Sequence, residues 1–147
     1  MPTQTLSIDN IPKGNQNFGA EVAITENFII VSDTWDNENG TNAGAIYTYS
    51  WSGTQWIPQQ KITPLSPSSN VYFGTNIVAH GDRFITKSPF EDKIYIFEWI
   101  GTTWTEFIVP LDPSIIALRT ISINDSYAAY SSSKNAYVFS QQNIPFC

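Results

Sequence analysis

The sequence has few of the residues that most often carry chemistry or bind nucleic acids. Among its 147 residues there are one cysteine, one histidine and one methionine. A single cysteine excludes an internal disulfide, and no His/Cys spacing of the kind that holds zinc is present. Only 7 lysines and arginines stand against 13 aspartates and glutamates, which gives a formal net charge of −6. Because phosphate backbones and anionic membrane surfaces repel such a chain, we expect no nucleic-acid partner.

Long apolar runs and helical patterns are also missing. No run approaches the ~18 apolar residues of a membrane span. The first ten residues, MPTQTLSIDN, lack the charged and apolar regions of a secretion signal. We therefore expect a soluble chain without membrane insertion or signal peptide, and its compartment stays open. No stretch of ten or more residues combines apolar positions at helical spacing with capping residues, and nine prolines argue against helices.

The sequence does contain many short runs of β-branched and aromatic residues. These runs alternate with a period of two and are bounded by Gly, Pro, Asn, Asp and Ser. Apolar residues make up 41% and aromatic residues 14% of the chain, which is enough for a folded domain with a core. The predicted fold class is all-β, in a single domain over residues 1–147.

The strand-forming runs belong to an internal repeat. Phe18-Gly19 recurs as Phe73-Gly74, and YTYSWSGTQW at 47–56 recurs as YIFEWIGTTW at 95–104. A third, weaker copy contains ISINDSYAAYSS and NAYVFS. In the first copy we expect strands near 20–24, 28–32, 45–51 and 56–63. Such four-stranded antiparallel meanders have the size of β-propeller blades, and we place three of them at 18–71, 73–113 and 117–147.

Residues 1–17 resemble the last strand and the linker of a copy. We expect this N-terminal strand to complete the last blade, which would hide an edge strand. Propellers use four to eight blades, so three are too few for a closed ring. Either two chains join into a six-bladed homo-oligomeric ring, or the chain is part of a larger propeller.

Two tryptophan pairs admit two interpretations. Gly53-Thr54 suits a two-residue type II′ turn, which places Trp51 opposite Trp56, and Gly101-Thr102 does the same for the pair of Trp99 and Trp104. Cross-strand aromatic pairs stabilise a hairpin by roughly 0.5–1.5 kcal/mol beyond burial of area. A role in the scaffold is favoured because the pairs recur with the repeat. Stacking of a glycan on these rings is the alternative.

The motif order resembles the FG-GAP repeat, the blade motif of integrin-α-like β-propellers. An FG pair is followed by an apolar run, then by GAIYTY and by a Trp before QKI. The first copy carries the motif on Phe18, Gly19, Val22, Gly44, Ala45, Tyr47, Tyr49, Trp56, Gln60, Lys61 and Ile62. The resemblance implies an adhesion-type propeller that recognises a protein or glycan partner through blade-end loops, at an extracellular or cell-surface location.

Members of this family often bind Ca²⁺ through a loop rich in aspartate, so the segment DTWDNENGT was compared with such a loop. If Gly40 is the turn glycine, the first ligand position falls on Trp35, which cannot coordinate calcium. Another arrangement of Asp33, Asp36 and Glu38 could still gather around a metal ion. A solvated acidic loop is favoured, and no cofactor is expected. For ligand binding the loop offers Trp35, Asp36, Asn37, Glu38 and Asn39.

Three functions fit these features. The first is a non-enzymatic recognition module that binds through the segment 33–42, as the resemblance implies. The second is a structural or assembly protein of a cell or virion surface, in which a homo-oligomeric ring is the product. The third is a hydrolase or lyase with carboxylates at a central channel. The acids are scattered over loops, so we expect no enzyme.

Overall fold

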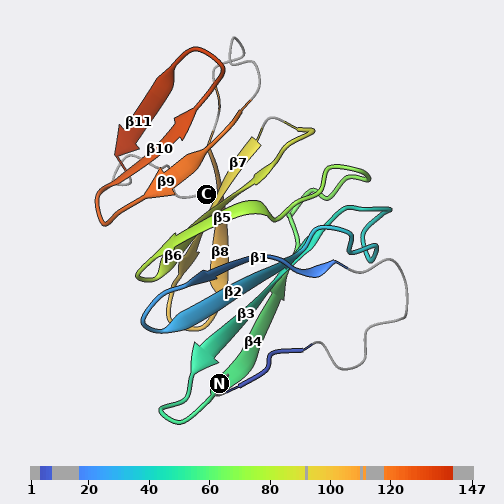
Figure 1. The fold of residues 1–147 in the computed structure, drawn as a ribbon, viewed down its shortest axis with the longest axis vertical. Helices are drawn as coiled ribbons and strands as arrows, with labels where there is room; N and C mark the ends of the chain where they lie inside the picture. Colours follow the sequence, from blue (N-terminus) through green and yellow to red (C-terminus); the bar gives the residue numbers. More distant parts are fainter. Residues whose placement is uncertain (1–3, 8–16, 92, 110, 112–117, 141–147) are drawn as a thin grey trace.

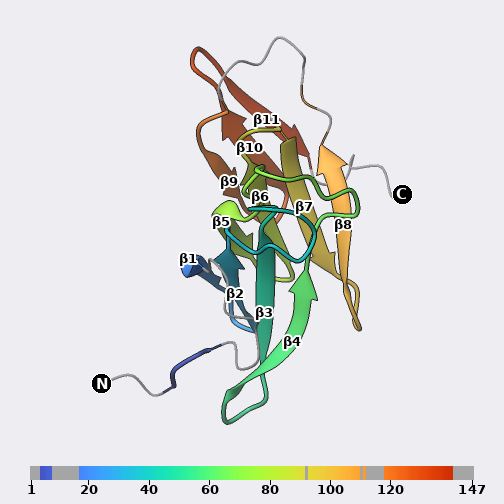
Figure 2. The same ribbon diagram turned by 90° about the vertical axis from the view of Figure 1, so that its right-hand side faces the viewer.

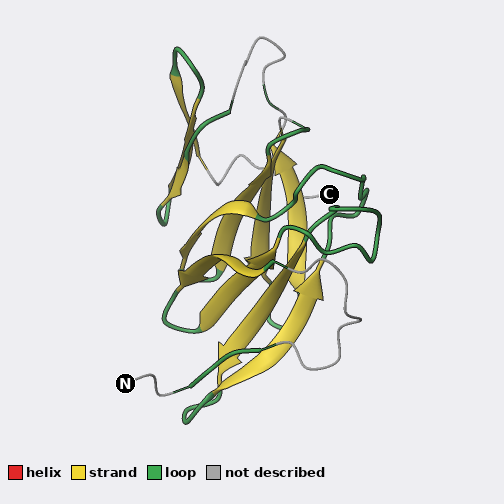
Figure 3. Cartoon of the chain, turned by 45° about the vertical axis from the view of Figure 1, so that its right-hand side comes forward, coloured by secondary structure: helices red, strands yellow, loops and turns green. Residues whose placement is uncertain are grey.

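The computed structural model describes residues 4–7, 17–91, 93–109, 111 and 118–140. Within these ranges every regular element is a β-strand and there is no helix, so none that could span a membrane (Figure 3). The all-β prediction is confirmed. The strands are β1 (Phe18–Ile24), β2 (Phe28–Asp33), β3 (Ala45–Trp51), β4 (Trp56–Ile62), β5 (Thr75–His80), β6 (Arg83–Ser88), β7 (Lys93–Trp99), β8 (Trp104–Val109), β9 (Ile121–Ile123), β10 (Tyr127–Ser131) and β11 (Ala136–Ser140).

The strands form three antiparallel meanders, one for each copy of the repeat. The first sheet has the order β1-β2-β3-β4 and the second β5-β6-β7-β8, whereas the third has three described strands in the order β11-β10-β9. The four strands expected in the first copy are confirmed to within two residues. Each sheet therefore has the blade-like arrangement that the repeat predicts.

The sheets follow one another along the long axis of the molecule (Figures 1 and 2). Neighbouring sheets meet through their first strands, because β1 contacts β5 and β5 contacts β9. The first and third sheets lie at opposite ends of this array (Figure 1). The described part of the chain is thus a row of three blades and not a closed ring.

Two apolar layers hold the row together. Between the first and second sheets the buried residues are Phe28, Ile30, Ile46, Ile62, Phe73, Ile77, Phe84, Tyr95, Phe97 and Trp104. Between the second and third sheets they are Ile85, Ile94, Ile96, Phe107, Leu118, Ile121, Ala128 and Tyr130. Burial of one large apolar side chain stabilises a fold by about 1.5–3 kcal/mol. These layers therefore stabilise each sheet against its neighbour.

The repeated FG pair lies where the chain enters a sheet. The ring of Phe73 is fully buried and meets Tyr95 edge-on, with 5.1 Å between ring centroids. Phe18 meets Tyr47 in the same way at 5.6 Å. Gly74 has a φ of +97°, and a Cβ there would lie 2.9 Å from the Cβ of Ser32. The glycine therefore permits both the backbone conformation and the close approach of the two sheets.

The described part of the N-terminal leader (residues 1–17) packs on the first sheet. The side chain of Gln4 accepts a hydrogen bond from the Trp56 amide at 2.8 Å and donates one to the Trp56 carbonyl at 2.7 Å. Leu6 packs against a cluster that contains Ile29 and Val31. Most of the segment 1–17, which the sequence assigns to the last blade, lies outside the described residues. Its described part, residues 4–7, contacts sheet one of the same chain and is not itself an assigned strand.

Candidate functional site: the loop between β2 and β3

The loop between β2 and β3, residues 34–44, starts from a buried aspartate. Asp33 is the last residue of β2 and is fully buried. Its Oδ1 accepts hydrogen bonds from the amide of Asn17 at 2.8 Å and from the amide of Trp35 at 3.1 Å. A carboxylate that binds the amide two residues ahead favours a turn. Asp33 thus ends the strand, begins the loop and ties it to the residue before β1.

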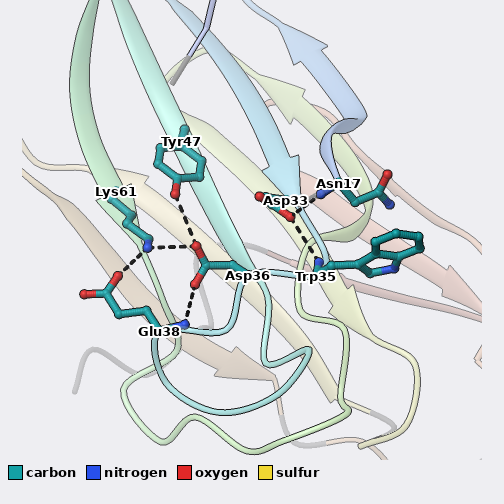
Figure 4. A network of polar contacts seen from close by, with 7 residues as sticks. All are labelled: Asn17, Asp33, Trp35, Asp36, Glu38, Tyr47 and Lys61. Carbon is teal, nitrogen blue, oxygen red and sulfur yellow. Dashed lines mark hydrogen bonds and ion pairs between the residues drawn. The ribbon is translucent and has the colours of Figure 1, made fainter. Parts of the chain in front are cut away.

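Asp36 is the centre of the polar network drawn in Figure 4. Its Oδ2 accepts hydrogen bonds from the Tyr47 hydroxyl at 3.2 Å and from the Lys61 ammonium at 2.8 Å. Its Oδ1 accepts the amide of Glu38 at 3.0 Å. Lys61 also forms an ion pair with the Glu38 carboxylate. A buried carboxylate with this many partners fixes the loop on strands β3 and β4.

The protonation states suit this network. Burial raises the pKa of Tyr47 to about 12, while Lys61 lowers and Asp36 raises it. For Lys61, burial lowers the pKa, but the hydrogen bonds to Asp36 and Glu38 and the negative charge of Asp36 together outweigh burial, and the net shift is upward. At neutral pH the phenol is a neutral donor and the ammonium is charged. The ammonium also lies 5.5 Å from the centroid of the Tyr47 ring.

The same acid–tyrosine pair recurs in the second sheet. The Tyr95 hydroxyl donates to Glu91 Oε2 at 2.9 Å. Glu91 follows Asp36 by the same number of residues as Phe73-Gly74 follows Phe18-Gly19. Both acids follow a turn in which their amide donates to the last residue of the preceding strand, to Asp33 at 3.3 Å and to Ser88 at 3.1 Å. The acid is therefore a repeated part of the blade, which the sequence analysis missed.

The three carboxylates considered for a metal ion do not converge. Asp33 binds backbone amides on one side of the loop, whereas Asp36 and Glu38 hold Lys61 on the other side (Figure 4). In the described ranges no group of three or more His, Cys, Asp or Glu residues could hold a metal ion. Lys61 supplies the positive charge that Asp36 and Glu38 face. The sequence analysis did not assign this role to the lysine of the QKI segment.

The crest of the loop, residues 35–39, is exposed except for Asp36, and hydrogen bonds within the loop hold it in place. Asn37 Oδ1 accepts the amide of Asn42 at 2.7 Å, and the amide of Gly44 donates to the Asp36 carbonyl at 3.1 Å. The exposed residues of the crest are Trp35, Asn37, Glu38 and Asn39. Asp36, the fifth residue considered for ligand contact, points inward and is buried. The loop thus presents one indole ring among polar groups on a fixed backbone.

The tryptophan pairs lie at the other end of the blades. The predicted pairing is confirmed, because Trp51 faces Trp56 and Trp99 faces Trp104 in the strand register. The centroids of the two rings are 5.2 Å apart in the first pair and 5.7 Å apart in the second. Trp51 and Trp99 are the last residues of β3 and β7, and their partners begin β4 and β8, whereas the loop precedes β3. The structure therefore does not bring the indoles of the two hairpins together with the loop.

The two pairs differ in exposure. Trp104 is buried between Phe28 and Phe84, with ring centroids at 4.8 and 5.0 Å, and Trp99 packs against Phe28 at 5.3 Å. No face of Trp104 is available for a sugar, which favours the scaffold interpretation of the second pair. Trp51, in contrast, is exposed. Of the four hairpin tryptophans, this ring is the most open to solvent.

Comparison with known proteins gives one family. The family model described as the FG-GAP repeat matches residues 12–49, a range that includes β1, β2, the β2–β3 loop and most of β3. Neither the curated proteins nor the solved structures contain a match to the chain.

Proposed function

We propose that the protein is a non-enzymatic recognition module of the β-propeller type, because residues 12–49 match the FG-GAP repeat. In this proposal the β2–β3 loop binds a partner through Trp35, Asn37, Glu38 and Asn39. The observation that carries this proposal is that the loop has buried residues that fix its backbone and exposed residues that can contact a partner. Buried Asp36 and Asp33 hold the backbone, and the side chains of the crest face solvent. Such loops on a rigid scaffold are common binding surfaces.

A protein partner fits the crest better than a glycan. Trp35 is an exposed large apolar side chain, and the exposed polar residues 37–39 follow it in the chain. Interfaces between proteins often place one such aromatic residue in a pocket of the partner and surround it with a polar rim. A fixed backbone lowers the entropy cost of binding. The loop has this combination, whereas a sugar platform would favour the two paired rings of Trp51 and Trp56.

A non-enzymatic role is supported by the use of the acidic residues. A carboxylate mechanism needs two acids that converge on one pocket. Asp36 accepts hydrogen bonds from Tyr47 and Lys61, and Glu91 accepts one from Tyr95. These carboxylates stabilise their own blades. We therefore assign the loop to binding and not to catalysis.

A binding screen with two matched variants tests the proposal. The wild-type protein is applied to a protein array and to a glycan array, together with the variants Trp35→Ala and Trp51→Ala. We expect protein ligands whose signal falls at least tenfold in Trp35→Ala and is retained in Trp51→Ala. Loss of binding only in Trp51→Ala, or binding of glycans alone, would contradict the assignment to the loop. Unchanged circular dichroism spectra show that both variants are folded.

A second candidate function, a structural or assembly protein, is favoured by a different observation. Apolar side chains are exposed at both ends of the row of sheets, with Val22 on the first sheet and Val138 on the third. Exposed apolar faces of this kind mark association surfaces. In this case the assembled ring would be the product. A homomeric complex without any ligand in the binding screen would favour this candidate.

A further inference from the structure

The contact between the first and second sheets defines how one blade meets the next. Phe28 of the first sheet packs on both rings of the pair Trp99 and Trp104. The outer strand β4 adds a polar contact, because Gln60 Oε1 accepts the amide of Trp104 at 3.0 Å. Ile62 of the same strand is buried in the layer between the sheets. An aromatic residue, a glutamine and an aliphatic residue therefore make the connection.

The leader repeats the contacts of β4, but in front of the first sheet. Gln4 Oε1 accepts the amide of Trp56 at 2.8 Å, as Gln60 does for Trp104. Leu6, two residues later, packs into the apolar cluster on that face, as Ile62 does one blade further along. Residues 4–7 thus occupy the place of an outer strand that belongs to a blade in front of the first sheet.

The described residues do not form that blade, and the first sheet shows the consequence. Val22 and Ile77 occupy matching positions in the first strands of their sheets, opposite Val31 and Thr86. Ile77 is 8% exposed because the first sheet covers it, whereas Val22 is 64% exposed. A cavity of about 380 Å³ also lies over β3 and β4 beside Ser7. The leader alone leaves this face partly uncovered.

The third sheet has the complementary deficiency. Its described strands end at β11, an edge strand without the outer strand that β4 and β8 provide in the other sheets. Val138 matches Thr48, which is 1% exposed in the first sheet, but Val138 is 69% exposed. Tyr127 occupies the position of Phe28, because the carbonyl of each accepts the hydrogen bond that closes the turn before its strand. Tyr127, however, is exposed. This face thus exposes apolar residues at positions that are buried between blades elsewhere in the row.

We propose that a second copy of this chain joins the two ends. The third sheet of one copy packs on the front of the first sheet of the other, with Tyr127 against Trp51 and Trp56. Residues 4–7 of the second copy pair with β11 and complete that blade. One copy supplies the three described strands of the third sheet and the other supplies residues 4–7 as the fourth, so the two open ends are complementary and the occupant is a second copy.

Two such contacts related by a twofold axis close a six-bladed ring. Six blades fall within the range of known propellers, and closure leaves no open edge strand. The register of β3 and β4 gives the pairing, since Ile46 faces Ile62 and Thr48 faces Gln60. By the repeat, Ala136 of one copy faces Leu6 of the other, and Val138 faces Gln4. This inference does not depend on the recognition function proposed for the loop.

The mass in solution tests the proposal, measured by light scattering across a range of micromolar concentrations. We expect twice the mass of one chain at every concentration. Val138→Lys is expected to shift the mass to one chain, while the matched control Ile108→Lys, on the exposed side of outer strand β8, is expected to leave it at two. A single-chain mass for the wild type, or a mass that grows with concentration beyond two chains, would overturn the closed pair. A Val138→Lys variant that stays at two chains would overturn this interface.

A crosslink tests the predicted register independently. In a Cys147→Ser background, Leu6→Cys and Ala136→Cys are combined and the protein is oxidised. We expect a disulfide-linked dimer on a denaturing gel, and at least fivefold less dimer for Leu6→Cys alone. A combined variant that is no more crosslinked than the single variant would contradict the pairing of residues 4–7 with β11.

Discussion

Tyr47 donates its phenol hydrogen to Asp36 Oδ2 at 3.2 Å, and this contact joins the β2–β3 loop to the middle strands of the first sheet. The second sheet contains the same contact between Tyr95 and Glu91 at 2.9 Å. The acid is an aspartate in a long loop and a glutamate in a short one. The pair is therefore retained while the loop around it changes in length, as expected when the scaffold is constant and the exposed crest varies.

Removal of this contact destabilises the first blade. Tyr47→Phe loses one hydrogen bond, and we expect the free energy of unfolding to fall by about 1 kcal/mol. Asp36→Ala leaves the Tyr47 hydroxyl without its acceptor and leaves the partly buried Lys61 with Glu38 alone, so a larger loss of about 1–3 kcal/mol is expected. Urea unfolding followed by circular dichroism measures both. An Asp36→Ala variant as stable as the wild type would show that the network is not structural.

Stability at alkaline pH depends on the same tyrosine. The pKa of Tyr47 is raised to about 12 by burial, compared with 10.0 for an ordinary tyrosine. A raised pKa means that the neutral phenol is the form the fold stabilises. Its contribution is complete below pH 10 and is lost as the pH rises through about 12. Burial also raises the pKa of Tyr95, so both groups act in the same direction.

Absorbance at 295 nm, which reports tyrosinate, checks this expectation. We expect Tyr47 and Tyr95 to titrate late, so that Tyr47→Phe has one late-titrating tyrosine fewer than the wild type, with a fall in melting temperature between about pH 10 and 12 that is smaller in the variant. If all tyrosines titrate together near pH 10 while the protein stays folded, the burial of Tyr47 and Tyr95 is contradicted.

The two FG glycines are expected to differ in their tolerance of alanine. Gly19 and Gly74 have similar positive φ angles of +88° and +97°. A Cβ at Gly19 meets no atom within 4 Å, whereas one at Gly74 meets Ser32 at 2.9 Å. Gly19→Ala is expected to cost about 1–2 kcal/mol through backbone strain alone, and Gly74→Ala at least about 1 kcal/mol more. Thermal unfolding compares the pair, and equal losses would argue against close contact between the sheets.

Much of this fold could be predicted from the sequence because the repeat fixes it. Alternation of apolar residues and the Gly-Thr turns determine the strands and the tryptophan pairs, and these are local properties. The contact of Asp36 with Lys61 could not be found in that way, since it joins residues 25 positions apart through the packing of a loop on β4. The acidic residue that follows the second strand of the sheet in both copies could have indicated this repeated contact. The loops around it differ in length, and this difference conceals the equivalence of the two acids.

The burial of Trp104 and the exposure of Trp51 could not be predicted either. Their sequence contexts are nearly the same, and the difference comes from the neighbouring sheet. The second sheet has another blade in front of it and the first has only the leader. A single sequence shows which positions are equivalent, whereas their environment depends on their place in the row.

Replacement of the buried indole is expected to be costly. Trp104→Ala removes a large side chain from the layer between two sheets, and we expect a loss of about 3–5 kcal/mol. Trp35→Ala removes an exposed ring from the loop crest and is expected to cost within about 0.5 kcal/mol. Denaturant unfolding of the two variants measures the contrast. Similar losses in both would mean that Trp104 does not belong to the core.

The central claim is that the first and second sheets stack as consecutive blades through equivalent aromatic positions. Nuclear Overhauser contacts between the ring protons of Phe28 and the indole protons of Trp104 test it most directly, because the ring centroids lie 4.8 Å apart across the two sheets. We expect strong contacts from Phe28 to both Trp99 and Trp104, together with cross-strand contacts within each tryptophan pair. Cross-strand contacts within the pairs, but none from Phe28 to Trp104, would show separate hairpins and contradict the stacked blades.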